Sequence, residues 1–271
     1  MSRSVQEKRA QFRQLHAQGC FVLPNPWDVG SAKMLEALGF NALATTSAGF
    51  AWSEGRPDNG VSRDMVIAHL REIVAATELP VNADFEGGFA STPQGVAESV
   101  RMAIDTGVAG LSIEDSTGDA NNPLRDIADA VTRMRAARAA IDERGGDTLL
   151  VGRAENFIAG RPDIDDTIAR LTAYSEAGAD CLYAPGVRTR EHIAAVVAAV
   201  APKPFNLLIG WPSDLTFSDV AALGVRRISV GGALARSAWG GFLRAAREVA
   251  EGRFAFAEAT PGAELNAAFR K

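Results

Sequence analysis

The chain has 271 residues, of which 47% are hydrophobic and 23% are charged, and its formal net charge is −5. This composition is typical of a soluble globular protein, and the acidic balance argues against nucleic acid or an anionic membrane as a partner. No apolar run approaches the ~20 residues that span a bilayer, and the charged N-terminus lacks the apolar core of a signal peptide, so we expect a cytoplasmic protein.

Short apolar runs alternate with helix-like segments along most of the chain. The pattern predicts an N-terminal helix at about residues 3–18 and strands at 20–24, 41–46, from 81, 110–114, 148–153, 179–184, 205–209 and 226–230. Helices are predicted at 28–38, 63–77, 93–106, 123–143, 163–177, 189–200 and 218–223, with a polar turn at 47–60. Helices dominate again in a C-terminal tail at about 233–271.

A glycine ends four of these helices just before the next strand, at Gly39, Gly107, Gly178 and Gly224, as a left-handed residue does after a helix. Eight strands separated by helices imply parallel pairing with right-handed crossovers. At this length the pattern favours a single (β/α)₈ TIM-barrel domain over residues 1–271. The alternative is an open doubly wound sheet, but no Gly-x-Gly-x-x-Gly motif follows the first strand, which argues against a dinucleotide-binding version.

Polar side chains follow many of the predicted strands, where the active site of such a barrel lies. The third strand ends in Asp84 and Glu86, two residues apart, before the Gly87-Gly88 pair. The other strand ends supply Asn25 and Trp27, residues 46–49, Glu114 with Asp115, Arg153 with Glu155 and Asn156, residues 185–186, Asn206 and residues 231–232. Carboxylates crowded at one mouth repel one another, and hard cations such as Mg²⁺ prefer oxygen ligands, so we expect a metal site.

The positions of the histidines and lysines exclude other chemistries. His16, His69 and His192 fall on predicted helices, which argues against a histidine base or a histidine-rich zinc site. No lysine lies at the carboxyl end of a strand, as a Schiff-base aldolase would need.

The motifs NPWD…SAK, TTSAG, GRPD, ADFEGGF, SIED and GRAEN, taken in this order, resemble the isocitrate lyase / phosphoenolpyruvate mutase superfamily from about Pro24 to Gly232. The resemblance implies a (β/α)₈ barrel whose C-terminal helices are exchanged between the subunits of a homodimer or homotetramer. It also implies Mg²⁺, with Mn²⁺ as an alternative, and cleavage or formation of C–C or P–C bonds in a small 2-oxo or 2-hydroxy acid.

The resemblance also implies roles for individual residues. Asp84 is the expected direct metal ligand, and Glu86, Glu114 and Asp58 are expected to hold the metal through water. Glu86 stands where many members have aspartate. The substrate carboxylate is expected at Ser47, Ala48 and Gly49. Trp27 is expected to close over the substrate, and Arg153 to neutralise the oxygen that becomes negative. From their places at strand ends, Glu155 and Asn206 are further candidates for substrate binding.

The loop at residues 116–123 departs from the pattern of isocitrate and methylisocitrate lyases, because it contains no cysteine to act as acid or base. Neither activity is therefore expected. Thr117 and Asn122 are the candidate catalytic residues of this loop, and simple turn formation is their alternative role. Three hypotheses remain: a Mg²⁺-dependent lyase, decarboxylase or hydrolase of a 2-oxo or 2-hydroxy di-acid, an enzyme of P–C bond chemistry, and a 2-oxo acid binding protein without turnover.

Overall fold

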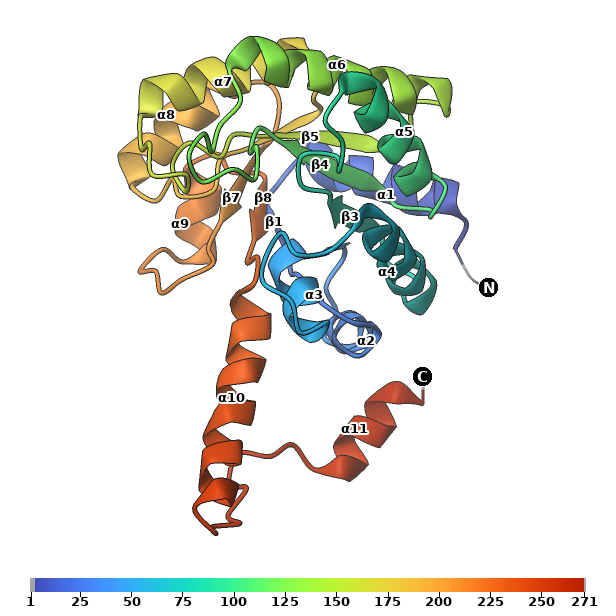
Figure 1. Cartoon of the computed structure of the whole chain (residues 1–271), viewed down its shortest axis with the longest axis vertical. Helices are drawn as coiled ribbons and strands as arrows, with labels where there is room; N and C mark the ends of the chain where they lie inside the picture. The colour runs from blue at the N-terminus through green and yellow to red at the C-terminus, as the bar shows by residue number, and fades with distance from the viewer. Residues whose placement is uncertain (1–2, 271) are drawn as a thin grey trace.

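In the computed structural model, which describes residues 3–270, eight parallel strands form one sheet that curls into a nearly closed barrel (Figure 1). The strands are β1 Phe21–Leu23, β2 Leu43–Ala44, β3 Val81–Asp84, β4 Gly110–Glu114, β5 Leu149–Arg153, β6 Cys181–Tyr183, β7 Phe205–Leu208 and β8 Arg227–Ser229. Their order is β1-β8-β7-β6-β5-β4-β3-β2, and the Ala44 N–H donates to the Pro24 carbonyl at 3.1 Å between the two ends of this order. The predicted (β/α)₈ barrel is confirmed.

Helices surround the sheet, at α1 Val5–Ala17, α2 Val29–Ala37, α3 Ser47–Ser53, α4 Arg63–Ala76, α5 Pro93–Ile104, α6 Ile127–Glu143, α7 Ile164–Glu176, α8 Arg190–Val200 and α9 Phe217–Ala222. The four glycines predicted to end helices all have the left-handed conformation, with φ between 86° and 107°. Only glycine adopts this conformation at low cost, so these positions stop each helix where the next strand must begin.

Two predicted boundaries are wrong. The first half of the predicted turn at 47–60 is helix α3, which Thr46 caps through its side chain. The small residues of this segment show no clear helical periodicity, and the helix instead depends on tertiary contacts, with Phe50 stacked on His69 at a centroid distance of 3.9 Å. Helix α6 begins at Ile127 rather than at residue 123, because Asp126 caps it by accepting from the Asp129 N–H.

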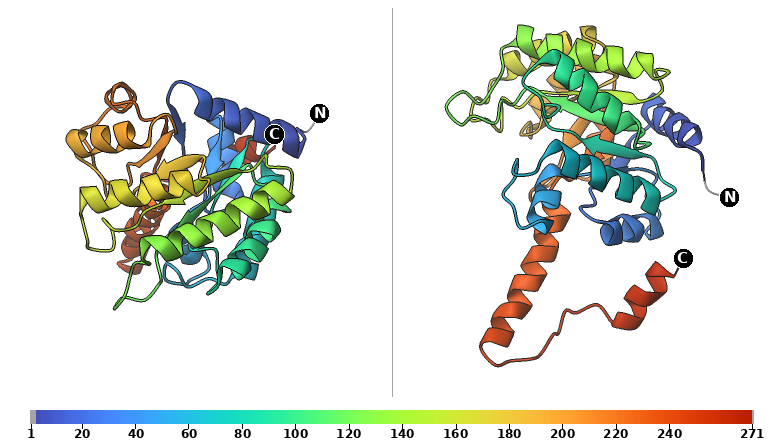
Figure 2. Two further views of the ribbon diagram at one scale, coloured as in Figure 1. Left: turned by 90° about the horizontal axis from the view of Figure 1, so that it is seen from above. Right: turned by 45° about the vertical axis from the view of Figure 1, so that its right-hand side comes forward.

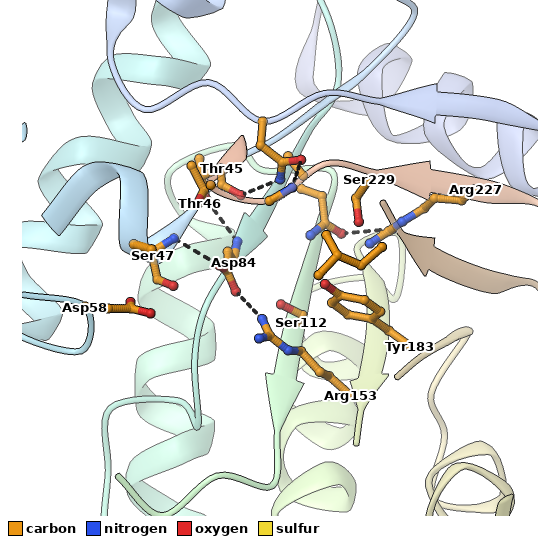
Figure 3. A pocket seen from close by; sticks show the side chains of 17 residues that line it. Thr45, Thr46, Ser47, Asp58, Asp84, Ser112, Arg153, Tyr183, Arg227 and Ser229 are labelled. Atoms are coloured by element: carbon orange, nitrogen blue, oxygen red, sulfur yellow. Dashed lines mark hydrogen bonds and ion pairs between the residues drawn. The ribbon is translucent and has the colours of Figure 1, made fainter. Parts of the chain in front are cut away.

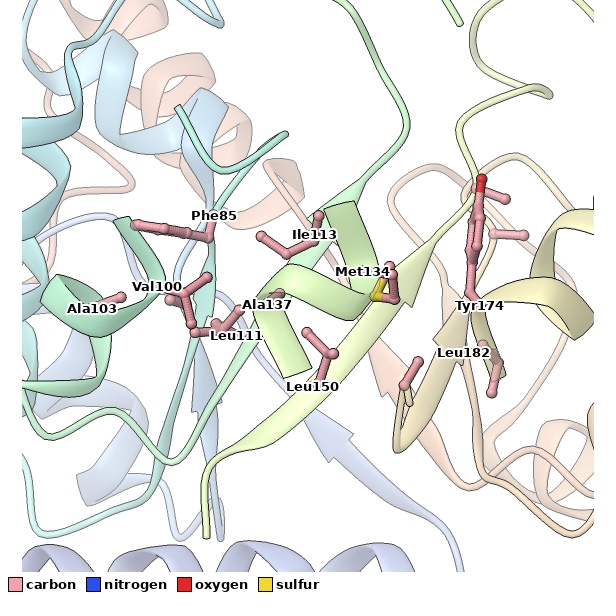
Figure 4. Packing of buried hydrophobic residues seen from close by; sticks show 14 of the residues in the cluster. Phe85, Val100, Ala103, Leu111, Ile113, Met134, Ala137, Leu150, Tyr174 and Leu182 are labelled. Atoms are coloured by element: carbon pink, nitrogen blue, oxygen red, sulfur yellow. The ribbon is translucent and has the colours of Figure 1, made fainter. Parts of the chain in front are cut away.

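The main hydrophobic core lies between the outer face of the sheet and the helices (Figure 4). Side chains of α5, α6 and α7 pack on β4, β5 and β6, including Val100, Met134, Tyr174, Leu111, Ile113, Leu150 and Leu182. Each fully buried leucine or isoleucine contributes roughly 1.5–3 kcal/mol. Gly152 allows α7 to approach β5 closely, since an added Cβ would lie 2.8 Å from the Tyr174 Cβ.

Helix α1 lies across the amino ends of the central strands. Its Arg9 Nε donates to the Val108 carbonyl just before β4 at 3.0 Å, and its Arg13 Nη2 donates to the Gly146 carbonyl before β5 at 2.6 Å. Phe12 is fully buried, and an added Cβ at Gly110 of β4 would lie 2.8 Å from its ring. Helix α1 therefore closes this end of the barrel.

The last two helices are α10 Ala233–Ala250 and α11 Gly262–Phe269. Helix α10 extends away from the barrel, and the chain then turns back so that α11 contacts α2 (Figures 1 and 2). The exposed apolar side chains of this arm include Trp239, Phe242, Leu243, Phe254, Phe256 and Phe269. Among residues 3–270, no helix has both the length and the apolar character needed to cross a membrane.

Candidate active site

A cavity of about 170 Å³ lies at the carboxyl ends of the strands (Figure 3). Ser47, Ala48, Asp58, Asp84 and Arg153 line its mouth, and the strand residues Asn82, Ser112, Tyr183, Arg227 and Ser229 also line it. Asn25, Ala44, Thr45, Thr46, Leu208 and the Gly231-Gly232 pair complete the wall. The cavity is thus assembled from residues of most of the strands, and most of its side chains are polar.

Arg153, at the end of β5, is the centre of a charged cluster. Its Nη1 lies 3.1 Å from Asp84 Oδ1 and 3.3 Å from Glu114 Oε2, and its Nε donates to Glu155 Oε1. The guanidinium also lies over the Tyr183 ring, 5.0 Å from the centroid. Burial raises the pKa of Glu114 well above its usual range and raises the pKa of Glu155, against the opposing effect of Arg153. One guanidinium faces three carboxyl groups, so acidic groups outnumber basic groups in the cluster.

Asp84 connects this cluster to helix α3. Its Oδ2 accepts from the Ser47 N–H at 2.9 Å while its Oδ1 faces Arg153, and its own N–H donates to Thr45 Oγ1 at 2.9 Å. Both carboxylate oxygens are therefore held in place at the cavity mouth.

Glu86 is held in an unusual environment. Its backbone is left-handed, with φ of 47°, which is uncommon for a residue with a side chain. Its Oε1 atom is buried without a hydrogen-bond partner among the described residues. Burial first, and then repulsion from Asp84 and Asp58, raise the pKa of Glu86 to about 8. Loss of solvent and the nearby Asp84 likewise raise the pKa of Asp58.

These observations fit a divalent cation. The four candidate ligands, Asp84, Glu86, Glu114 and Asp58, offer only oxygen atoms, which suit Mg²⁺ or Mn²⁺. Within residues 3–270 no three His, Cys, Asp or Glu side chains converge tightly enough to surround an ion directly. Water would therefore supply much of the coordination shell, as is usual for Mg²⁺.

The other expected substrate residues lie at different depths. Ser47 and Ala48 line the cavity, whereas the Gly49 N–H donates to Thr46 Oγ1 at 3.3 Å within α3. Trp27 is half-buried and its Cβ faces Gly49, outside the cavity lining. Asn206 is fully buried behind the wall, where its Nδ2 donates to Ser229 Oγ at 3.0 Å.

The 116–123 loop contributes to a second cavity of about 230 Å³ beside the first. Thr117 lines it together with Glu86, Glu114 and Arg125. The Thr117 hydroxyl donates to the Asn122 carbonyl, whereas the Asn122 side chain is exposed and contributes to a separate surface hollow. Of the two loop candidates, Thr117 lies nearer to the carboxylates.

A buried network below the cluster orients the end of β5. Asp115 is 1% exposed and accepts from Tyr174 Oη at 2.6 Å, from Arg170 Nη1 at 2.9 Å and from the Glu155 N–H at 2.8 Å. Asp115 is therefore a buried structural residue and not part of a solvated turn. Asp115 instead fixes the backbone directly after Arg153.

Sequence reasoning missed several cavity residues in the strands or directly after them: Thr45, Asn82, Ser112, Tyr183, Arg227 and Ser229. A signal for two of them was present, because alternate residues of a strand face the same side. Asn82 and Ser112 stand two positions before Asp84 and Glu114, and so share their face of the sheet.

A model of the phosphoenolpyruvate phosphomutase family matches residues 12–250. The chain belongs to this family. It is 34% identical to an uncharacterized protein of Mycobacterium tuberculosis, over 94% of this chain and 95% of that protein. It is also 31% identical to an oxaloacetate decarboxylase of Bradyrhizobium diazoefficiens, over 77% of this chain and 72% of that enzyme.

Solved structures of family relatives share the fold. A Burkholderia cenocepacia J2315 protein whose name suggests a lyase or mutase is 48% identical, with a TM-score of 0.95, over 99% of this chain and 98% of that one. Oxaloacetate acetylhydrolase, solved with its product oxalate, is 26% identical, with a TM-score of 0.87, over 97% and 94% of the two chains. The superfamily expected from the motifs is confirmed.

Proposed function

We propose that this phosphomutase-family protein is an enzyme that cleaves a C–C bond in a small 2-oxo or 2-hydroxy dicarboxylate with the help of Mg²⁺ or Mn²⁺. Lyase, decarboxylase and hydrolase reactions all belong to this class, because each leaves an enolate whose negative charge must be stabilised. The observation that carries the proposal is the Arg153 cluster, in which one guanidinium and an excess of carboxylates share the mouth of one cavity.

When bound, the metal would act as a Lewis acid that stabilises the negative charge developing on the carbonyl oxygen of the substrate. Asp84 is the proposed direct ligand, and Glu86, Glu114 and Asp58 are proposed to hold the ion through water. Support comes from the unpartnered Oε1 of Glu86 and from the raised pKa values of Glu86 and Asp58, since a bound cation offsets both the burial and the mutual repulsion.

The chain's own residues supply the remaining stabilisation. Arg153 donates to the oxygen that becomes negative, and such a preorganised donor contributes about 3 kcal/mol in the transition state. Glu155 fixes the guanidinium through its Nε and Nη1 faces Asp84 and Glu114, which leaves Nη2 as the donor for the substrate oxygen. The Ser47 and Ala48 segment is proposed to bind a substrate carboxylate, and Thr117 or Asn122 to transfer the proton.

The sequence of the curated decarboxylase relative and the oxalate complex of a structural relative support the C–C reaction class. P–C bond chemistry on a phosphonate is the second candidate, and one observation favours it. Arg125 is only 18% exposed, lines the cavity beside Thr117 and has a buried Nε without a partner among the described residues, so it offers an additional cationic donor. The Nη1 of Arg125 pairs with Asp129 at 3.0 Å, which leaves its Nε as the available donor, and the guanidinium of Arg188 stacks on Trp211 at 3.6 Å from the ring centroid.

A product-release assay separates these functions. Pyruvate, CO₂ and oxalate are measured from oxaloacetate, 2-methylisocitrate, four-carbon malates and phosphonopyruvate, with Mg²⁺ and with a chelator. We expect Mg²⁺-dependent turnover of a di-acid that falls by about 10²–10³-fold in Arg153→Met. Arg161→Met, at an exposed arginine outside the cavity, is the control. Turnover of phosphonopyruvate alone would favour the second candidate, and binding without turnover would favour a binding protein.

We also propose that the protein is a homodimer or homotetramer in which α10 and α11 dock on another copy. The arm leaves the barrel and exposes a cluster of aromatic and aliphatic side chains, which a monomer would leave in water. Trp239 and Phe242 form an edge-to-face pair on its surface, with ring centroids 5.6 Å apart. Size-exclusion chromatography of the wild type and of Phe242→Asp tests this proposal, and a monomeric wild type would refute it.

A further inference from the structure

A buried arginine lies at the floor of the active-site cavity. Arg227, the first residue of β8, is 2% exposed, and its side chain lines the cavity opposite the charged mouth (Figure 3). Its Nε donates to Asn206 Oδ1 at 2.7 Å, and its Nη1 lies 3.3 Å from His16 Nε2 and 3.4 Å from Asn82 Oδ1.

The groups around this guanidinium are neutral. No carboxylate of residues 3–270 forms a salt bridge with Arg227, unlike the buried Arg170, which pairs with Asp115 and Asp166. Burial and the adjacent Arg227 lower the pKa of His16 to about 3, and its Nδ1 lies 2.7 Å from the Phe12 carbonyl, so a neutral ring donates there and accepts from Arg227. An arginine stays protonated, so this charge is buried without a counter-ion.

One donor of Arg227 remains free. The Nη2 atom forms no hydrogen bond within the described residues, and the Arg227 side chain lines the cavity, so this donor is available to a ligand there. The hydroxyls of Ser112 and Ser229 line the same region. Asn206 fixes Nε, so the fork is held in one orientation while its outer edge stays available.

We propose that Arg227 binds the second carboxylate of a dicarboxylate at the floor of this cavity and so selects di-acids over mono-acids. The identity of the ligand rests on the proposed function, but the binding preference does not depend on turnover. The carboxylates at the mouth suit a cation, whereas the floor carries an unpaired positive charge. A ligand with an anionic group at its far end therefore complements the cavity, and a guanidinium fork matches carboxylate geometry.

Succinate and butyrate are a matched pair of probes, because butyrate has the same carbon chain with one carboxylate fewer. Their affinities are measured by isothermal titration calorimetry in the presence of Mg²⁺, for the wild type, Arg227→Gln and Arg226→Gln. Arg226 is the matched control: it precedes Arg227, but donates to the Gly19 carbonyl at 2.8 Å on the outside of the barrel.

We expect the wild type and Arg226→Gln to bind succinate at least tenfold more tightly than butyrate. In Arg227→Gln the affinity for succinate should fall at least tenfold, while that for butyrate should stay within about twofold. Equal effects on the two probes, or a preference that survives in Arg227→Gln, would overturn the proposal. Should that variant not fold, Arg227→Lys is used, and it should keep a preference for succinate at reduced affinity.

The wild type also provides a test. If it binds succinate and butyrate equally well, or binds neither of them, the proposal is overturned. The outcome is separable from that of the proposed function. A preference for succinate without turnover of any di-acid would remove the proposed function alone. Wild-type turnover of a di-acid by Arg227→Gln would remove the role of Arg227 alone.

Discussion

The metal site is tested most sharply by the pH dependence of stability in Glu86→Gln. In the folded protein without metal, the pKa of Glu86 lies at about 8, against an ordinary value of 4.5. The folded state therefore holds this proton where the unfolded chain has lost it. The stability that the proton contributes is complete below pH 4.5 and disappears as the pH rises through about 8.

The magnitude follows from the size of the shift. Between pH 6 and pH 9 the wild type should lose about 3 kcal/mol of unfolding free energy from this group, since about two pKa units lie between pH 6 and the folded-state pKa and each corresponds to about 1.4 kcal/mol. Glu86→Gln carries no titrating proton, so its stability should change less over this range. The raised pKa of Glu114 acts in the same direction and will leave a residual slope.

Urea unfolding at pH 6 and pH 9, with a chelator and with Mg²⁺, provides the measurement. Mg²⁺ should restore the stability of the wild type at pH 9 and have less effect on Glu86→Gln. Glu72→Gln, at an exposed glutamate of α4, is the matched control and should behave as the wild type does. The reasoning is refuted if the wild type and Glu86→Gln have the same pH dependence in the chelator.

Further substitutions test other parts of the site. Asp84→Ala should abolish activity and its Mg²⁺ dependence with an unchanged circular dichroism spectrum, and unaltered turnover would remove Asp84 from the metal site. Asp115→Asn should lower the free energy of unfolding by about 3 kcal/mol, because it breaks a buried ion pair with Arg170. A urea unfolding midpoint equal to that of the wild type would contradict this. Thr117→Val should lower kcat more than Asn122→Ala, and wild-type kinetics in both would make the loop a turn only.

The barrel was predictable because its signals are local. Each strand is a short apolar run, and glycines such as Gly39 and Gly178 mark the helix ends where the backbone must become left-handed. The carboxylates of the site were predictable for a related reason. Asp84 and Glu114 come at strand ends, and parallel strands bring such ends together.

Other features depend on tertiary structure. Helix α3 is held by the contact of Phe50 with His69, which is 19 positions away in the sequence and invisible to local patterns. The role of Asp115 requires Tyr174 and Arg170 from a helix more than 50 residues later in the chain. Arg227 is preceded by a second arginine, so only the register of β8 determines which of the two points into the barrel.

Helix α1 has a kinetic consequence for the proposed cleavage reaction. With Phe12 seated at the amino ends of the strands, a bound molecule must enter and leave through the carboxyl end alone. When a substrate is cleaved in a cavity that is open at one end only, the product nearer the opening must dissociate before the deeper product can leave. Product inhibition patterns should then show ordered release, with the product that contacts Arg227 dissociating last.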